Sequence, residues 1–235
     1  MENATKLHTI ATCRSCFADK FGVPRQPGLT RHAWGELLIA PEYAREEAFR
    51  GLEECTHLWL TFQFHKALRE GWNPVVRPPR LGGNRKIGVF ASRSPFRPNS
   101  LGLSVVRNEG LVRRNGRLIL RIREHDLVDG TPIFDIKPYL PFADSIADAR
   151  LPWAAEPPVE RHQVQFSEAA VKALAGLDDE LYPEFRALIE DVVGFDPRPS
   201  FRRGSEEERI YGVCLYRFNI RFRFVGETVE VISIE

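Results

Sequence analysis

The stretch RKIGVFASRSPFRPNSLGL, residues 85–103, is the most informative part of this chain. Short β-rich runs begin and end within it and are separated by Gly and Pro, which is the punctuation of a strand-rich fold. Pro95, Pro98 and Asn99 fix the chain around Arg93 and Arg97. We therefore interpret this stretch as a loop that holds a ligand, in preference to a run of solvated charges.

The charge around this stretch has one sign. Residues 77–123 contain twelve Lys or Arg and one acid, Glu109. Because the guanidinium group matches phosphate with a planar fork of donors, such a field favours a polyanionic partner, and nucleic acid is the first to consider.

The asymmetry extends to the whole chain of 235 residues, although 33 basic and 32 acidic side chains leave a net charge of only +1. Residues 1–150 carry net +7 and residues 151–235 carry net −6. The two halves are therefore expected to differ in role. With 43% hydrophobic residues, the chain is long enough to bury one sizeable core and a smaller one.

The first 150 residues predict more strands than helices. Strand-like runs lie at 8–12, 35–39, 57–64, 87–91, 103–107 and 117–123. One helix is predicted at 41–52, behind an N-terminal proline and with a single apolar face formed by Tyr43, Ala44, Ala48, Phe49 and Leu52. Strands and helices do not alternate, so we predict an antiparallel sheet or a barrel and not a doubly wound fold.

A proline-rich stretch, LPWAAEPPVE at 151–160, predicts a linker between a β-rich domain at 1–150 and a small α+β domain at 161–235. In the second domain Ser167 is placed to cap a helix that runs to about Leu174. Strands are expected at 218–224 and 228–234. A second helix is predicted from the apolar stripe Leu181, Phe185, Leu188, Ile189, Val192 and Val193.

Several classes of protein are disfavoured. No apolar run approaches the roughly 20 residues of a membrane helix, and no secretory signal begins the chain, so we expect a cytoplasmic protein without a membrane partner. Cys13 and Cys16 form a lone CxxC, which is a weak metal signal, and we expect reduced thiols and no metal. Cys55 and Cys214 are interpreted as small core residues.

Four polar loops are candidates for lining one pocket: 21–29, 64–66, 85–103 and 126–142. Each also has a simpler explanation. The first suits a surface connection, His65 suits a core position, and Asp129-Gly130 is a good turn sequence in its own right. The chain lacks both GxGxxG and GxxxxGK[ST], so the common nucleotide-binding loops are disfavoured.

The segment GVFASRSPFRPN at 88–99 resembles the signature of the TsaA-like (TrmO) family of tRNA methyltransferases. Other stretches resemble landmarks of the same family in the same order. They are KFGVPRQPG (20–28), RGLEECTHLWL (50–60), VRPPRLGGN (76–84), LVDGTPIFDIKPYLPFA (127–143) and DPRPSFRRG (196–204). One departure is Ser15-Cys16-Phe17, where family members often have Ser-Pro-Phe or Ser-Pro-Tyr.

This resemblance implies methylation of N6 of threonylcarbamoyladenosine at tRNA position 37, next to the anticodon, with S-adenosylmethionine as methyl donor. It also implies an N-terminal β-barrel in place of a Rossmann sheet, and a homodimer with the site near the subunit interface. The residues that match the family's cofactor contacts are Arg25, Gln26, Pro27, His65, Lys66, Arg93, Leu103, Asp129, Gly130, Thr131 and Pro132.

Chemistry suggests roles for some of these residues. Gln26 suits the adenine edge, Asp129 a ribose hydroxyl or the ammonium group, and Arg93 the methionyl carboxylate. The candidates for holding the acceptor base are Asp135, Lys137 and Tyr139, unless DIKPY is simply a strand end with exposed charges. The candidates for binding the anticodon loop are Arg85, Lys86, Arg97, Asn99, Arg198, Arg202 and Arg203.

Two functions of other classes remain open. A non-catalytic RNA-binding barrel would also explain the arginines, but it would not need the loops of His65, Arg93 and Asp129. A β-barrel hydrolase or isomerase acting on a small molecule would use His65 with Asp129 or Asp135, and would turn over without a methyl donor.

Overall fold

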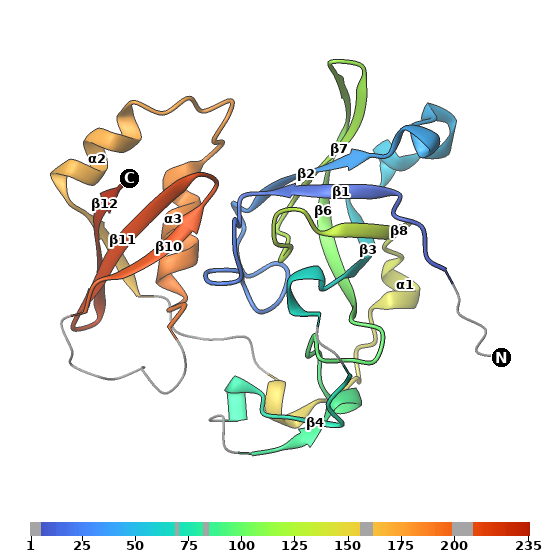
Figure 1. The fold of residues 1–235 in the computed structure, drawn as a ribbon, viewed down its shortest axis with the longest axis horizontal. Coiled ribbons are helices and arrows are strands. Elements are labelled where there is room, and N and C mark those ends of the chain that lie inside the picture. The colour runs from blue at the N-terminus through green and yellow to red at the C-terminus, as the bar shows by residue number, and fades with distance from the viewer. Residues whose placement is uncertain (1–5, 69–70, 82–84, 156–161, 199–208) are drawn as a thin grey trace.

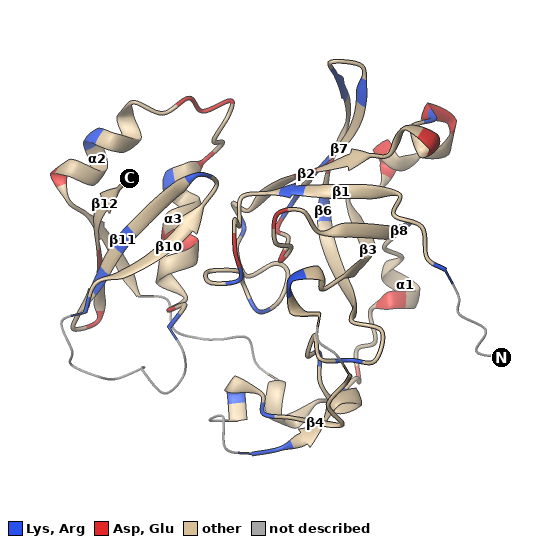
Figure 2. Ribbon diagram, in the orientation of Figure 1, with Lys and Arg blue, Asp and Glu red and all other residues tan. Residues whose placement is uncertain are grey.

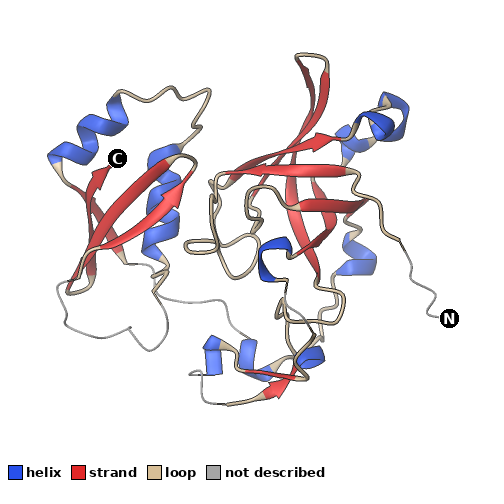
Figure 3. Ribbon diagram, viewed as in Figure 1, coloured by secondary structure: helices blue, strands red, loops and turns tan. Residues whose placement is uncertain are grey.

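The computed structural model describes residues 6–68, 71–81, 85–155, 162–198 and 209–235. It contains a closed barrel built from the first half of the chain and a four-stranded sheet with two helices built from the second half (Figures 1 and 3). In the described part of the chain no helix is both long enough and apolar enough to cross a membrane.

Six antiparallel strands close the barrel in the order β1-β2-β7-β6-β3-β8. The strand-rich fold expected from the sequence is therefore confirmed, and the runs at 35–39, 57–64 and 117–123 all form strands. The six strands are β1 Ala11–Ser15, β2 Trp34–Ile39, β3 His57–Gln63, β6 Leu101–Arg114, β7 Arg117–Arg123 and β8 Pro132–Pro138.

Alternate side chains of these strands fill the barrel. In β3 the residues Leu58, Leu60 and Phe62 are buried, while the residues between them are only partly covered. Leu37 of β2 and Leu120 of β7 complete the same core. This packing fixes the register, because a slip of one residue would turn every buried side chain of a strand outward.

The helix predicted at 41–52 is wrong. The segment forms three 3-10 turns, η1 Pro41–Tyr43, η2 Glu46–Phe49 and η3 Leu52–Glu54. Arg45 is extended and Gly51 has a φ of 88°, so neither can continue a right-handed helix. The apolar residues of the predicted face, Tyr43, Ala44, Phe49 and Leu52, still pack on the barrel core.

The strand predicted at 87–91 is only partly correct. β5 Ile87–Gly88 pairs with β4 Val75–Val76 in a two-stranded sheet, and the chain then turns into η6 Val89–Ala91. Arg97 Nη1 donates hydrogen bonds to the carbonyls of Val89 and Ser92, at 3.3 and 2.8 Å, which holds the coiled segment after β5. The neighbouring 3-10 turns are η4 His65–Ala67 and η5 Pro79–Leu81.

The C-terminal sheet has the order β10-β11-β12-β9, with β9 parallel to β12. Ser167 caps the first helix as expected, because its hydroxyl accepts a hydrogen bond from the Ala170 N–H at 3.1 Å. The second helix begins later than predicted, since Leu181 precedes it and is 64% exposed. The elements are η7 Pro152–Ala154, β9 Gln163–Phe166, α2 Glu168–Ala175, α3 Phe185–Gly194, β10 Tyr211–Leu215, β11 Phe218–Val225 and β12 Thr228–Ile234.

The segment after β1, residues 16–33, leaves the barrel and completes the C-terminal core. Cys16, Phe17 and Ala33 are buried in one cluster with Val213 and Leu215. The Tyr216 N–H also donates to the Cys16 carbonyl at 2.6 Å. The domain boundaries placed around 151–160 stay a prediction, but the second core takes side chains from both halves of the chain.

Candidate functional site

One end of the barrel gathers the loops that the sequence analysis singled out. Strands β1 and β3 end there, and β6 and β8 begin there, as their antiparallel pairing requires (Figure 1). The loops at this end span 16–33, 64–66, 88–100 and 124–131. Four segments that lie far apart in the sequence are thus brought to one edge.

The loop before β8 is tied to β1 by its backbone. The Ser15 N–H donates to Asp129 Oδ1 at 2.9 Å, and the Gly130 N–H donates to the Cys13 carbonyl at 2.8 Å. Gly130 has a φ of 80°, which a residue with a side chain rarely adopts. Thr131 is buried and its hydroxyl donates to the Val128 carbonyl at 2.6 Å. The DGTP turn is therefore held in one shape.

His65 faces this turn. Its Nδ1 lies 3.4 Å from Thr131 Oγ1, and a Cβ built on Gly130 would lie 3.7 Å from its Nε2. Burial, followed by the charge of Lys66, lowers the pKa of His65, so the imidazole is neutral at pH 7. Lys66 donates from Nζ to the Ala18 carbonyl at 2.7 Å and so joins the loop after β3 to the loop after β1.

Arg93 lies beside a carboxyl group that the sequence analysis did not select. The Arg93 guanidinium donates to the Leu103 carbonyl at 2.9 Å. Burial raises the pKa of Asp126 to about 6, while a hydrogen bond from Ser104 and the charge of Arg93 act in the opposite direction. Asp126 Oδ1 is enclosed and has no hydrogen-bond partner among the described residues. Asp126 is the first residue of the polar loop 126–142 chosen from the sequence, but its burial is visible only in the structure.

The loop that contains Arg25, Gln26 and Pro27 contacts the same end of the barrel. The Gly28 N–H donates to the Glu124 carbonyl at 2.9 Å, and the Gln26 side-chain amide donates to the Arg25 carbonyl. Arg25 is exposed. The structure thus brings all the expected cofactor residues to loops or strand ends on one side of the barrel.

The donor set at this end fits S-adenosylmethionine. An exposed guanidinium, Arg93, can bind a carboxylate, and an exposed carboxylate, Asp129, can bind an ammonium or a ribose hydroxyl. Leu103 offers apolar surface to an aromatic base. Asp126 adds a second carboxyl group with an oxygen that the described residues leave without a donor.

The three acceptor candidates do not all reach these loops. Asp135 lies in mid-strand, with Oδ2 3.4 Å from Lys137 Nζ. Tyr139 follows the far end of β8, where its N–H donates to the His57 carbonyl and its ring lies 5.9 Å from Trp59. A strand of this length spans about 20 Å, so Tyr139 belongs to the opposite end of the barrel.

The candidates for nucleic-acid binding also divide. Arg85, Lys86 and Asn99 are exposed, and Lys and Arg recur along the segment around β4 (Figure 2). Arg97 is partly buried and holds its own loop through the hydrogen bonds given above. The remaining two candidates, Arg202 and Arg203, lie outside the described residues.

The assignment of Arg198 to nucleic-acid binding is wrong. Arg198 is 5% exposed, and it donates from Nε and Nη2 to the two carboxylate oxygens of Asp196, at 2.8 and 2.9 Å. Its guanidinium also stacks 3.5 Å from the centroid of the Phe224 ring. A guanidinium paired in this way holds the C-terminal domain together and does not face a phosphate.

The CxxC cysteines hold neighbouring segments of the site through their backbone carbonyl groups. Cys13 and Cys16 are free thiols, both fully buried, and burial raises the pKa of each. Their backbone carbonyls accept the hydrogen bonds from Gly130 and Tyr216 described above. Cys55 and Cys214 are only partly buried.

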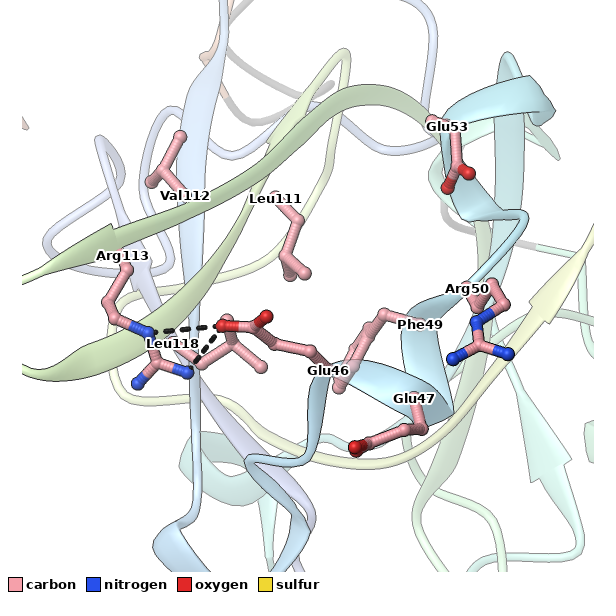
Figure 4. Close-up of a pocket in the computed structure, with 9 residues that line it drawn as sticks. All are labelled: Glu46, Glu47, Phe49, Arg50, Glu53, Leu111, Val112, Arg113 and Leu118. Atoms are coloured by element: carbon pink, nitrogen blue, oxygen red, sulfur yellow. Dashed lines mark hydrogen bonds and ion pairs between the residues drawn. The ribbon is translucent and has the colours of Figure 1, made fainter.

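A hollow of about 510 Å³ lies elsewhere, between η2, η3 and the β6–β7 hairpin (Figure 4). Its wall carries Glu46, Glu47 and Glu53, and Glu46 Oε1 lies 2.7 Å from Arg113 Nη2. None of the expected site residues lines it. Arg50 and Arg113 also line this hollow, so its charge is mixed, and we keep the loop end of the barrel, where the expected residues gather, as the candidate site.

Two family models match the chain. The tRNA-methyltransferase O N-terminal domain matches residues 12–145, and the TrmO C-terminal domain matches residues 159–235. The tRNA (adenine(37)-N6)-methyltransferase of Escherichia coli (strain K12) is 46% identical over 230 residues, which cover 98% of this chain and 97% of that protein.

Two further proteins extend the match. A relative from Pseudomonas aeruginosa is 45% identical over 215 residues, which cover 92% of this chain and 90% of that protein; its name describes an S-adenosylmethionine-dependent methyltransferase. The crystal structure of TrmO from Pseudomonas aeruginosa has a TM-score of 0.82 at 37% identity, covering 99% of this chain and 98% of that chain.

Proposed function

We propose, since this chain belongs to the tRNA-methyltransferase O family, that its acceptor is threonylcarbamoyladenosine at position 37 of tRNA. The chain is an S-adenosylmethionine-dependent tRNA (adenine(37)-N6)-methyltransferase. The proposal concerns the threonylcarbamoyl group on that adenine and the residues that serve the reaction. The gathering of four matching loops at one end of the barrel is the observation that carries it.

Family membership removes the two other functions left open by the sequence. A non-catalytic RNA-binding barrel would not need a methyl donor, and a hydrolase or isomerase would turn over without one. His65 and Asp129 therefore serve methyl transfer in this proposal.

The chain's part in the reaction is to bind and align. S-adenosylmethionine supplies a methyl group bound to a sulfonium, which a nitrogen can attack in line. We assign Arg93 to the methionyl carboxylate and Asp129 to the ammonium or a ribose hydroxyl, with Arg25, Gln26 and Pro27 beside the adenine. The rigid DGTP turn and the neutral His65 limit the movement of the bound groups. Alignment of this kind supplies much of the acceleration.

The N6 proton does not require a strong base before attack. The nitrogen can lose its proton during or after bond formation, so a weak acceptor near the site suffices. His65 has a lowered pKa and one ring nitrogen near Thr131, which makes it a neutral group able to accept a proton.

The modified base suits the charge near the site. The threonylcarbamoyl group carries a carboxylate, and residues 71–100 contain six Lys or Arg and no acid. Arg85 and Lys86 are exposed on this segment, and they are assigned to the phosphates of the anticodon loop or to that carboxylate. Cations also make binding of tRNA dependent on salt.

A homodimer would explain the exposed apolar side chains at the end of β8 that carries Tyr139. Asp135, Lys137 and Tyr139 run away from the four loops along β8. Near Tyr139, α1 Pro141–Asp144 carries Phe142 with 88% of its surface exposed, and Ile146 follows with 65% exposed. A second copy that covers these apolar side chains would remove them from water. The tRNA substrate is consistent with a cytoplasmic protein.

The test is transfer of labelled methyl groups from S-adenosylmethionine to two tRNA pools. One pool carries threonylcarbamoyladenosine and the other comes from cells unable to make it. Label in the modified pool alone is the expected result. Equal labelling of both pools would contradict the proposed acceptor while leaving the adenine methyltransferase activity intact.

A further inference from the structure

Two exposed aromatic side chains, Trp72 and Phe90, lie together on the segment between β3 and β6. Trp72 is 50% exposed and Phe90 is 70% exposed. Their ring centroids are 5.9 Å apart with an angle of 31° between the planes. We propose that this aromatic pair is a platform on which an unpaired base of the tRNA anticodon loop stacks. The proposal depends on tRNA being the substrate and not on the threonylcarbamoyl group.

The platform is built into the fold. β4 follows Trp72 and β5 precedes Phe90, and these two strands pair through Val75 with Gly88. The Val89 N–H donates to the Pro74 carbonyl at 2.9 Å, which extends the pairing toward both rings. Phe90 thus directly follows a hydrogen-bonded residue, and Trp72 lies three residues before β4.

The surroundings favour nucleic acid over other occupants. The Arg97 guanidinium carbon lies 5.7 Å from the centroid of the Phe90 ring. Arg85 and Lys86 are exposed just before Phe90, and residues 71–100 contain no acid. Aromatic faces between cations are the surface that binds single-stranded RNA, because bases stack on the rings while phosphates meet the charges. A purely apolar partner would leave these cations without an anion.

The position of the platform along the chain also fits the reaction. Phe90 lies three residues before Arg93, which we assign to the methyl donor. The same short segment thus carries a proposed donor contact and an exposed ring. Position 37 lies next to the anticodon, so a neighbouring base must pass close to the donor whenever the adenine reaches it. Stacking that neighbour would hold the loop open at the acceptor.

The test compares four variants of the full-length protein in binding to an anticodon stem-loop RNA at several salt concentrations. Trp72→Ala and Phe90→Ala are expected to weaken binding about tenfold to a hundredfold. Trp72→Phe and Phe90→Tyr are expected to retain most of it, because they keep a ring. Affinity for S-adenosylmethionine, measured by titration without RNA, is expected to stay within twofold in all four. Leu181→Ala is the matched control for loss of an exposed apolar side chain, since Leu181 is 64% exposed on the other domain.

The slope of binding against salt separates stacking from charge. Stacking displaces no counterions, so Trp72→Ala and Phe90→Ala should lower the affinity without changing the slope. The double variant Arg85→Ala with Lys86→Ala should reduce the slope of RNA affinity against salt concentration. Unchanged RNA affinity in both alanine variants would overturn the proposal. The proposal would also be overturned if sedimentation showed that either alanine variant has a lower mass than the wild-type protein. The aromatic pair would then form a contact with a second copy of the chain. The RNA measurement stands whether or not the threonylcarbamoyl group proves to be required.

Discussion

Asp126 and Arg93 form a pair of opposite charges next to the proposed donor site, and one oxygen of Asp126 has no described partner. We expect Asp126→Asn to weaken S-adenosylmethionine binding about tenfold, because the charge that orients Arg93 is lost. The affinity of the wild-type protein should also fall as the pH drops through about 6, the pKa of this carboxyl. Titration of S-adenosylmethionine between pH 5 and 8 measures both effects.

The pH profile of the Asp126→Asn variant tests whether Asp126 is the group that titrates near pH 6. Asp126→Asn should show no change of affinity near pH 6, whereas the wild-type protein should. An identical pH profile in the two proteins would mean that another group is responsible. Binding of tRNA serves as the control, because Asp126 lies on the proposed donor side and should leave it unaltered.

His125 couples the stability of the barrel to pH. It is fully buried, its Nδ1 accepts from the Leu127 N–H at 3.2 Å, and burial lowers its pKa to about 4. In the unfolded chain the imidazole gains its proton near pH 6.5, so between pH 6.5 and 4 the unfolded state binds more protons. This group should cost about 3 kcal/mol of unfolding free energy as the pH falls across that window.

Denaturation in urea at several pH values tests this prediction. Asp126 acts in the opposite sense, because its raised pKa gives the folded state the extra proton below about pH 6. The measurement is therefore made in an Asp126→Asn background, with and without His125→Leu. Loss of stability on acidification should be smaller when His125 is absent. An unchanged dependence on pH would show that other groups dominate.

At the scale of residues, the sequence predicted the gathering of the cofactor loops better than the roles of single side chains. Arg93, His65 and Asp129 could be selected because each lies in a polar segment rich in Gly or Pro. Arg198 was misassigned because a pattern of charges does not reveal that Asp196, two residues away, turns back and pairs with it. Asp126 was missed for a related reason, since burial of a carboxyl group depends on contacts with distant strands.

At the scale of elements, the segment 16–33 connects the proposed donor site to the C-terminal domain. It carries Arg25, Gln26 and Pro27 at its tip, and Phe17 at its base is buried in the C-terminal core. Asp191 of α3 also holds its far end, because Asp191 Oδ2 accepts from the His32 N–H at 3.0 Å and lies 2.9 Å from His32 Nδ1. The loop is thus fixed at both ends by the other domain.

Asp191→Ala should therefore affect donor binding from a distance. The part-buried His32 N–H would lose its acceptor, at a cost of about 1 kcal/mol in stability. We expect a severalfold loss of affinity for S-adenosylmethionine under conditions where the variant remains folded, measured by titration beside circular dichroism. Glu190→Ala is the matched control, because Glu190 lies on the same helix and pairs with Arg186 at the surface. Equal donor affinity in the variant and the control would contradict the coupling.

Element predictions succeeded for short β-rich runs and failed where backbone conformation decided the outcome. The runs that form β2, β3 and β7 were correctly predicted as strands, because each is a short run rich in strand-forming residues. At 41–52 the apolar positions also matched a helical face, but the left-handed Gly51 and the extended Arg45 divide the segment into 3-10 turns. Apolar spacing alone does not determine these backbone angles.

At the scale of the molecule, the opposite charges of the two halves meet where the domains touch. Glu184 of the acidic half accepts from Trp34 Nε1 at 2.9 Å and lies 3.6 Å from Arg123 Nη1. Arg123 belongs to the basic window 77–123, from which we first inferred a nucleic-acid partner. Part of that positive charge therefore stabilises the contact between the domains. On the segment around β4 and β5, where Lys and Arg recur (Figure 2), Arg85 and Lys86 stay exposed.

The sharing of one core by residues 16–33 and the last strands has a consequence for synthesis. Phe17 emerges early from the ribosome, yet its neighbours Val213 and Leu215 come almost last. Until then its ring has only part of its native surroundings, such as the His125 ring 5.5 Å away, and contacts of such long sequence separation form slowly. A nascent chain thus carries this loop, with the proposed donor residues, unfinished for most of its translation, and a premature stop after the barrel would release a protein in which the C-terminal core does not support the loop.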